Sequence, residues 1–244
     1  MDASLLLALT AAGFGAGFTQ GLAGFGSTLV ALPCLILVMD LRQATPVACI
    51  LAIVLNAVLA CRLRGHVRTR ALGLLLAASL PGMAVGAYGL RSLPEAWLKG
   101  LLAMTILGYV AWFLRRSGPA RRADWKFGVA AGFLAGSLGA AIGVNGPPVV
   151  AWVSRLGIDR NAVRGTQTAY FFLAGIGVVA SQAAAGLVTG QVLARTAVAV
   201  PALLVGLAAG MAGCGRISEA AFGRVVLVVL VLTAASLLAQ VAAG

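Results

Sequence analysis

Acidic residues are scarce in this chain of 244 residues, which contains only six Asp and Glu. Each of them lies at the end of an apolar segment rather than within one: Asp2, Asp40, Glu95, Asp124, Asp159 and Glu219. Proton-driven membrane carriers place a carboxylate or a histidine inside the bilayer, where an ionisable group is costly and therefore functional. The sequence thus argues against a proton relay built from protein side chains.

Histidine and paired cysteine are missing as well. The single histidine, His66, lies among arginines in a basic loop, and no two cysteines form a C-x-x-C pair. An intramembrane protease would need a Ser–His or Asp–Asp pair within the membrane, and a structural metal site would need clustered Cys or His ligands. We therefore expect no enzyme activity, no cofactor, no metal and no disulfide. The four cysteines are expected to fill apolar helix positions: Cys34, Cys49, Cys61 and Cys214.

Apolar side chains are what the sequence has in abundance. It is 61% hydrophobic and 10% charged, with a mean hydropathy of +1.02, whereas soluble proteins carry about 25% charged residues. This composition predicts an integral membrane protein. The 18 Lys and Arg lie in short loops, so the net charge indicates topology signals and contacts with anionic lipid rather than nucleic-acid binding. Because no basic region precedes the apolar run at Ser4, we expect the N-terminus to be retained.

The apolar segments predict an all-α, polytopic membrane protein with about eight to ten helical segments. We expect helices or hairpin legs at residues 3–22, 27–39, 45–61, 71–90, 97–114, 127–155, 166–187, 193–212 and 222–241. The legs 3–22 and 27–39 are at or below the roughly 20 residues needed to cross a bilayer. They are therefore predicted to form a hairpin of half-length or strongly tilted helices. Pro81 predicts a kink in the segment 71–90.

Helix-breaking residues interrupt two of these apolar segments. Residues 136–148 contain four glycines and two prolines in thirteen residues, which prevents a continuous helix. A shift of 119 positions lays Gly24, in the run 24–28, on Gly143 in the run 143–147. Irregular backbone at membrane depth is tolerated only where protein or a watery cavity satisfies its polar groups. Paired breaks in two halves of a chain are typical of a transporter's binding site.

The repeat divides the chain into two halves. We predict a first transmembrane repeat at 1–114, a basic cytoplasmic linker at 115–126 and a second repeat at 127–244, each repeat made of a broken hairpin and three transmembrane helices. Pro81 and Pro201 correspond at an offset of 120, and Glu95 and Glu219 also correspond. The kinked span and the loop that follows it are therefore predicted to be repeated as well.

The basic residues favour one orientation. If each hairpin enters and leaves on one face and three spans follow it, the two halves are inverted. All Lys and Arg then share one side except Arg42, Arg91, Lys99 and Arg195. If each hairpin crossed the membrane once, the split would be nearly even. The positive-inside rule thus favours the inverted arrangement, with both termini outside the cytoplasm and the two hairpin tips meeting near the midplane.

The hairpin tips offer backbone N–H groups, glycine surfaces and uncharged side chains. A half-helix that begins after a break presents unpaired N–H donors and about half a positive charge, so two such ends make an anion site without Lys or Arg. Ser27 suits a helix cap and Pro147 a first-turn position. The predicted substrate-binding residues are Gln20, Gly24, Gly26, Ser27, Thr28, Asn56, Gly143, Asn145, Gly146, Pro147 and Gln167. Packing between helices is the competing interpretation for any single glycine.

With these breaks at 21–27 and 143–148, each followed by an apolar leg and a helix start at 42–45 and 160–166, the sequence resembles the sulfite exporter TauE/SafE family, also called the toluenesulfonate uptake permease family. The resemblance extends over nearly the whole chain. It implies a multi-pass carrier of the bacterial inner membrane for sulfite, sulfonates or related small anions. Phe25, Ser27 and Thr28 depart from the family's Gly-Gly-Gly form, so the particular anion is left open.

Export of a monovalent anion from a cell at about −100 mV gains roughly 2.3 kcal/mol and needs no coupling ion. We therefore expect an exporter of a small anion, in contact with membrane lipid and with a homodimer as one possible state. The alternative is an uptake permease or channel for an organic carboxylate or sulfonate. A membrane scaffold is a third hypothesis, but it would not need two interrupted hairpins.

Overall fold

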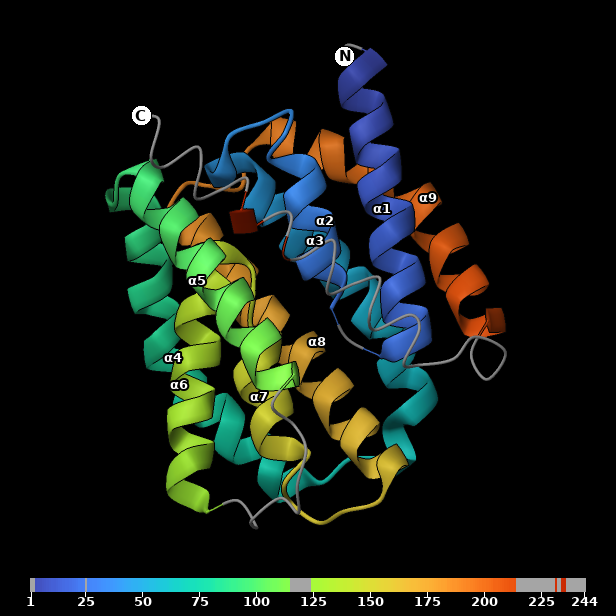
Figure 1. Cartoon of the computed structure of the whole chain (residues 1–244), viewed down its shortest axis with the longest axis vertical. Coiled ribbons are helices and arrows are strands. Elements are labelled where there is room, and N and C mark those ends of the chain that lie inside the picture. Colours follow the sequence, from blue (N-terminus) through green and yellow to red (C-terminus); the bar gives the residue numbers. More distant parts are fainter. Residues whose placement is uncertain (1–2, 25, 115–123, 214–230, 232–233, 236–244) are drawn as a thin grey trace.

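The computed structural model describes residues 3–24, 26–114, 124–213, 231 and 234–235, and the regular secondary structure in this part of the chain is all helical. The helices are α1 (Ala3–Ala23), α2 (Ser27–Leu35), α3 (Leu41–Leu63), the 3-10 turn η1 (Arg64–His66), α4 (Thr69–Ser92), α5 (Glu95–Leu114), α6 (Trp125–Ile142), α7 (Gly146–Val153), α8 (Arg160–Ala184) and α9 (Gly190–Gly213) (Figure 1). The all-α prediction is confirmed. Phe25, linker residues 115–123, Cys214, Glu219 and nearly all of the predicted segment 222–241 lie outside the described residues.

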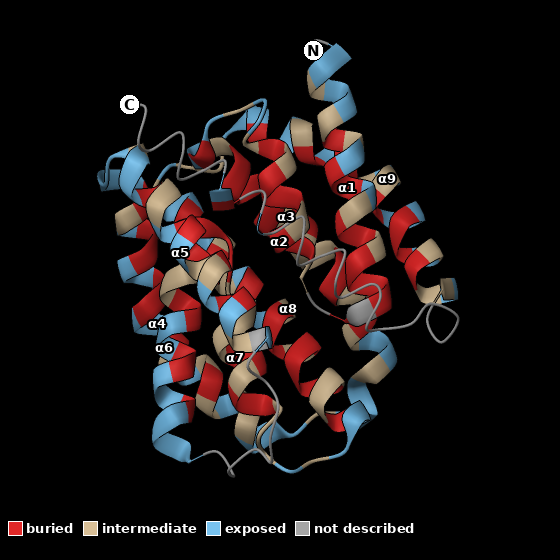
Figure 2. Ribbon diagram, in the orientation of Figure 1, coloured by how far each residue is buried: buried red, intermediate tan, exposed pale blue. Residues whose placement is uncertain are grey.

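Five of the described helices are long and apolar enough to cross a membrane. These are the segments Ala3–Leu22, Leu41–His66, Thr69–Ser92, Trp125–Ile142 and Gly190–Gly213. Large apolar side chains such as Leu80, Tyr88, Met104 and Val205 are more than half exposed, whereas α3 and α8 lie in the centre and each has a buried face (Figure 2). An apolar outer surface around a buried pair of helices is what a lipid-embedded bundle requires.

The two hairpins have legs of unequal length, where the sequence predicted a hairpin of half-length or strongly tilted helices. The first legs, α1 and α6, have 21 and 18 residues, whereas the second legs, α2 and α7, have 9 and 8. At about 1.5 Å per residue, α1 is roughly 31 Å long and matches the thickness of a bilayer's hydrocarbon core. The second legs reach about half that depth. Helices α1 and α6 begin at opposite ends of the molecule, and their breaks lie between the ends (Figure 1).

Helices α3 and α8 begin earlier than their apolar patterns predict. Helix α3 begins at Leu41 rather than residue 45, and α8 at Arg160 rather than residue 166. An aspartate precedes each start, and the Asp159 carboxylate accepts a hydrogen bond from the backbone N–H of Ala162 at 2.9 Å. This N-cap stabilises a polar first turn that hydropathy alone assigns to a loop.

The closest helix contacts join the two halves of the chain. Helix α1 packs along α9, and α4 packs along α6. Glycines let the backbones touch: a Cβ at Gly17 would lie 2.1 Å from the Leu203 carbonyl oxygen, and one at Gly86 would lie 2.1 Å from that of Ser137. Helix pairs in lipid gain no hydrophobic driving force, so small residues at such crossings stabilise them through close van der Waals packing.

These two crossings match each other at an offset that the prolines did not reveal. Gly206 and Gly210 of α9 face the carbonyls of Phe14 and Phe18, and Gly82 and Gly86 of α4 face those of Phe133 and Ser137. The α1 and α6 residues correspond at 119, but those of α4 and α9 correspond at 124, the offset of Glu95 and Glu219. The pairing of Pro81 with Pro201 at 120 was therefore wrong, since packing and not the kink sets the register.

Charged side chains make different contacts at the two ends of the molecule. At one end an ion pair of 3.8 Å joins Arg68, which directly precedes α4, to Asp159, which directly precedes α8. The hydrogen bond from Ala162 lowers the pKa of the Asp159 carboxyl. At the other end Arg42 donates to the carbonyl oxygen of Leu93 at 2.9 Å, and Arg195 donates to Gln43. Bonds to exposed backbone carbonyls and side-chain oxygens keep these two arginines at the rim.

Candidate functional site

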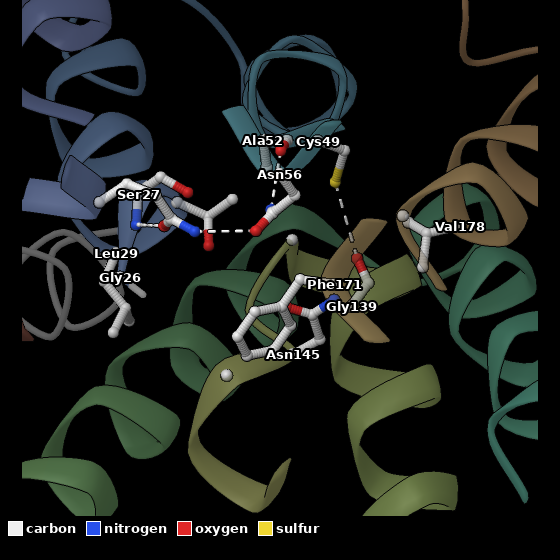
Figure 3. A pocket seen from close by; sticks show the side chains of 15 residues that line it. Gly26, Ser27, Leu29, Cys49, Ala52, Asn56, Gly139, Asn145, Phe171 and Val178 are labelled. Atoms are coloured by element: carbon white, nitrogen blue, oxygen red, sulfur yellow. Dashed lines mark hydrogen bonds between the residues drawn. The ribbon is translucent and has the colours of Figure 1, made fainter. Parts of the chain in front are cut away.

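The two backbone breaks line one cavity. Its volume, measured as the space open to the centre of a water molecule, is about 30 Å³, room for a few waters or one small ion. Its lining residues come from both hairpins and from the central helices α3 and α8 (Figure 3). They are Gln20, Gly26, Ser27, Thr28, Leu29, Cys49, Ala52, Asn56, Gly139, Gly143, Asn145, Gly146, Phe171, Gly175 and Val178.

The first break is a turn between α1 and α2 that requires glycine. Gly24 and Gly26 have φ angles of +82° and +93°, a region that side chains with a Cβ rarely adopt. The N–H of Gly24 donates to the carbonyl of Gln20 at 2.8 Å and closes α1. The chain then reverses, and α2 begins with Ser27 beside the cavity.

The Gln20 side chain ties this turn to the central helix α3. Its Oε1 accepts a hydrogen bond from the backbone N–H of Ser27 at 3.2 Å, and its Nε2 donates to Oδ1 of Asn56 at 2.9 Å (Figure 3). Asn56 in turn donates to the carbonyl of Ala52 at 2.8 Å. The prediction that Ser27 caps its own helix was wrong, because Gly26 is the N-cap residue and a glutamine from α1 supplies the oxygen.

The second break follows the same course with different chemistry. Gly143, at φ +70°, donates to the carbonyl of Gly139 at 2.9 Å and ends α6. Asn145 is the N-cap residue of α7, but its side chain makes no capping hydrogen bond and lines the cavity. Pro147 lies in the first turn as predicted. Because Pro147 and Pro148 have no N–H, that turn offers fewer donors than α2, and Asn145 becomes the main polar side chain on this wall.

The central helices close the sides of the cavity. Cys49 of α3 approaches the carbonyl of Gly139, with its sulfur at 3.8 Å from the oxygen. Gln182 of α8 donates to the Ala140 carbonyl at 3.0 Å behind the second break, and its Oε1 is buried with no hydrogen-bond partner among the described residues. Phe171 and Val178 form the apolar part of the wall.

None of the described residues that line the cavity carries a charge. Its polar groups are carboxamides, hydroxyls, backbone N–H groups and one thiol. Such a wall can hold an anion by hydrogen bonds with neutral donors, assisted by the two half-helix N-termini. In the described part of the chain, no three His, Cys, Asp or Glu side chains are grouped as a metal ion would need.

Most of the predicted site residues lie at this cavity, and three do not. Gly24 lies against the Arg164 side chain, Pro147 is not among the lining residues, and Gln167 is buried in α8 outside the lining. The lining residues that sequence reasoning missed are Leu29, Cys49, Ala52, Gly139, Phe171, Gly175 and Val178.

The repeat offset of 119 could have found part of this missed set. It carries Gln20 onto Gly139 and Asn56 onto Gly175, and both members of each pair line the cavity. It also carries Ala52 onto Phe171. Gln20, Ser27 and Asn56 of the first half therefore each pointed to a lining glycine in the second half, whereas Thr28 pointed to Pro147, which does not line the cavity.

The comparisons with known proteins agree with this architecture. The family model described as sulfite exporter TauE/SafE matches residues 9–237, which includes both breaks and the central helices. No curated protein and no solved structure matches the chain.

Proposed function

The chain belongs to the sulfite exporter TauE/SafE family of membrane transporters, and from this we propose that it exports a small anion, sulfite or an organosulfonate, from a bacterial cell across the inner membrane. The transported anion occupies the cavity between the two hairpin breaks. The observation that carries this proposal is the convergence of residues 20–29 and 139–146, distant in sequence, on one uncharged cavity.

The size and wall of the cavity favour a compact oxyanion. The cavity leaves about 30 Å³ open to the centre of a water molecule, and this size suits sulfite better than a larger aromatic sulfonate. Side-chain amides such as Asn56 and Asn145 can donate to sulfite oxygens, and the Ser27 and Thr28 hydroxyls can do the same. Neutral donors bind the ion without a buried opposite charge, so release on the far side is not prevented by a tight ion pair.

The paired crossings support an inverted repeat as the mechanical basis of transport. Helices α1 and α9 form one unit and α4 and α6 form its counterpart, each held by glycine–carbonyl contacts. The cavity lies where the hairpins of the two units meet. Rocking of one unit against the other about α3 and α8 would open the cavity to each face in turn.

Charge and membrane potential support export as the direction of transport. A monovalent anion leaving a cell at about −100 mV gains roughly 2.3 kcal/mol, a ratio of nearly fifty in concentration. In the described part of the chain no carboxylate lines the cavity, so the anion's own charge is the simplest driving term.

A binding assay on purified protein tests the substrate class. Sulfite should raise the melting temperature, since a ligand that binds only the folded state stabilises it, and sulfate, sulfoacetate, taurine and simple carboxylates serve as comparisons. Asn145→Ala should abolish most of the sulfite effect. Asn161→Ala is the matched control, because Asn161 is exposed at the start of α8. Stabilisation by cations alone would contradict the proposal.

Proteoliposomes test direction. Efflux of sulfite should accelerate when the compartment it leaves is made negative, with no requirement for a proton or sodium gradient. Accumulation that depends on either gradient would identify an uptake permease instead.

A further inference from the structure

Arg164 of α8 reaches the first break from outside the cavity. A Cβ at Gly24 would lie 3.2 Å from its Nε and 3.7 Å from its Nη2. The φ of +82° requires glycine at position 24, and the guanidinium lies against that glycine. The carbonyl of Gly24 also accepts a hydrogen bond from Gln20 at 3.4 Å, and Gln20 lines the cavity. One residue layer thus separates the guanidinium from the anion site.

The guanidinium has unused hydrogen-bonding capacity. Its Nε is buried and has no partner among the described residues. The ion pairs formed within those residues are Arg68–Asp159 and Lys99–Glu95, so no described carboxylate neutralises Arg164. A buried donor without an acceptor is costly, more so on a charged group. Arginine's planar fork is suited to the oxygens of an oxyanion.

We propose that Arg164 is an anion receptor at one mouth of the cavity, where it holds the transported oxyanion before the ion passes the Gly24 turn. This inference rests on the proposed function, because it assigns a second position on the path to the same cavity. The ligand is an oxyanion of the sulfite or sulfonate class, bound by the guanidinium in a charge-assisted hydrogen bond.

The opposite mouth lacks such a charge. At the repeat offset of 119, the residue that corresponds to Arg164 is Thr45. Thr45 holds the matching place at the second break, with its Cγ2 at 3.5 Å from the Cβ position of Gly143. The two mouths therefore differ by a full positive charge, and the receptor serves one direction of transport.

The surroundings of Arg164 draw anions to its mouth. The next residue, Gly165, packs against His66 and Leu63, with a Cβ position at 3.1 Å from each, so the basic loop after α3 lies directly beside the start of α8. The exposed arginines at this end are Arg62, Arg64, Arg68, Arg70 and Arg160. A cluster of like charges at an opening raises the local concentration of counter-ions. Arg164 is half-buried beside this group, and its guanidinium lies at the break itself.

Sulfite transport by oriented proteoliposomes tests the receptor. Arg164→Gln should raise the half-saturating sulfite concentration at the basic end by about tenfold, the loss expected for one charge-assisted hydrogen bond, with a smaller change at the other end. Arg164→Lys should recover part of the loss. Arg70→Gln removes the same charge from an exposed position at the same end and should change the value by less than about twofold. Equal effects of Arg70→Gln and Arg164→Gln, or no effect of Arg164→Gln, would overturn the proposal.

A chemical readout on the wild-type protein separates this inference from the proposed function. Phenylglyoxal modifies arginines, and peptide mass spectrometry measures the rate at each site. Sulfate, toluenesulfonate or acetate, none of which reacts with phenylglyoxal as sulfite does, should slow modification of Arg164 but not of Arg70. If no anion of this panel protects Arg164, the receptor is refuted even where sulfite is transported. If another anion protects Arg164 while sulfite is not transported, the receptor stands and the sulfite assignment fails.

Discussion

Gln20 and Asn56 join the first hairpin to the central helix through a single hydrogen bond of 2.9 Å from Nε2 to Oδ1. The other atom of the same carboxamide accepts from the N–H of Ser27. One side chain thus holds α1, the start of α2 and α3 together, and both partners line the cavity. Because Gln20 is only 1% exposed, each of its polar atoms depends on these partners.

Two substitutions of Gln20 separate the effect of an added negative charge from the effect of lost hydrogen bonds. Gln20→Glu keeps an acceptor for Ser27 N–H but brings a negative charge to the cavity, so sulfite binding should fall by about tenfold or more. Gln20→Leu leaves the Ser27 N–H and Asn56 Oδ1 unpaired and should lower the melting temperature instead. Both effects are measured by thermal denaturation with and without sulfite. Stronger sulfite binding by Gln20→Glu would show that the cavity does not prefer anions.

Two glycines of α4, one packed against the other half of the chain and one in open space, test the role of glycine packing between the halves. A Cβ at Gly86 of α4 would lie 2.1 Å from the Ser137 carbonyl oxygen, whereas one at Gly73 of the same helix meets nothing within 4 Å. Gly86→Ala should therefore force α4 and α6 apart and destabilise the protein by about 1–3 kcal/mol. Gly73→Ala should leave the melting temperature unchanged or slightly higher. Equal melting temperatures for the two variants would contradict the close crossing.

Much of the fold was predictable because its signals are local. Glycines and prolines inside an apolar run mark a break at whatever depth it lies, so the turns at Gly24 and Gly143 could be placed from the sequence. Hydropathy likewise located the helices, but not their polar first turns. The start at Arg160 depends on the side chain of Asp159, which accepts a hydrogen bond from Ala162, whereas Asp40 precedes Leu41 without a side-chain cap.

Contacts between the halves could not be read in the same way. The register of α4 against α6, and of α9 against α1, is set by glycines that face carbonyls on another helix. The sequence around each glycine does not show which helix it will contact. The proline offset consequently misled by four positions. The same limit applies to the cavity: Cys49 and Val178 line it because of how α3 and α8 cross, whereas Gln20, with its polar amide in an apolar helix, was conspicuous.

Gly146 allows the width of the cavity to be changed without straining the backbone. Its φ is not positive and a Cβ there meets nothing within 4 Å, yet it lines the cavity. Gly146→Ala and Gly146→Val should keep the melting temperature while sulfite transport decreases in that order. Any larger sulfonate that is carried should be lost first.

Gly143→Ala is the matched comparison, because Gly143 lines the same cavity at φ +70°. A side chain at that angle costs about 1–2 kcal/mol, so this variant should lose stability as well as transport. Transport that is unaffected by Gly146→Val would place the path elsewhere.

The positive-inside rule predicts the orientation of the bundle from its unequal ends. Gly65, in η1 at the basic end, and Gly190, at the start of α9 near the Arg195–Gln43 contact, are both exposed with open space around them. In a variant whose four cysteines are replaced by alanine, Gly190→Cys should react with a membrane-impermeant maleimide in intact cells. Gly65→Cys should react only after the membrane is permeabilised. The reverse pattern would turn the basic end outward. Arg164 would then collect anions from outside, which favours uptake over export.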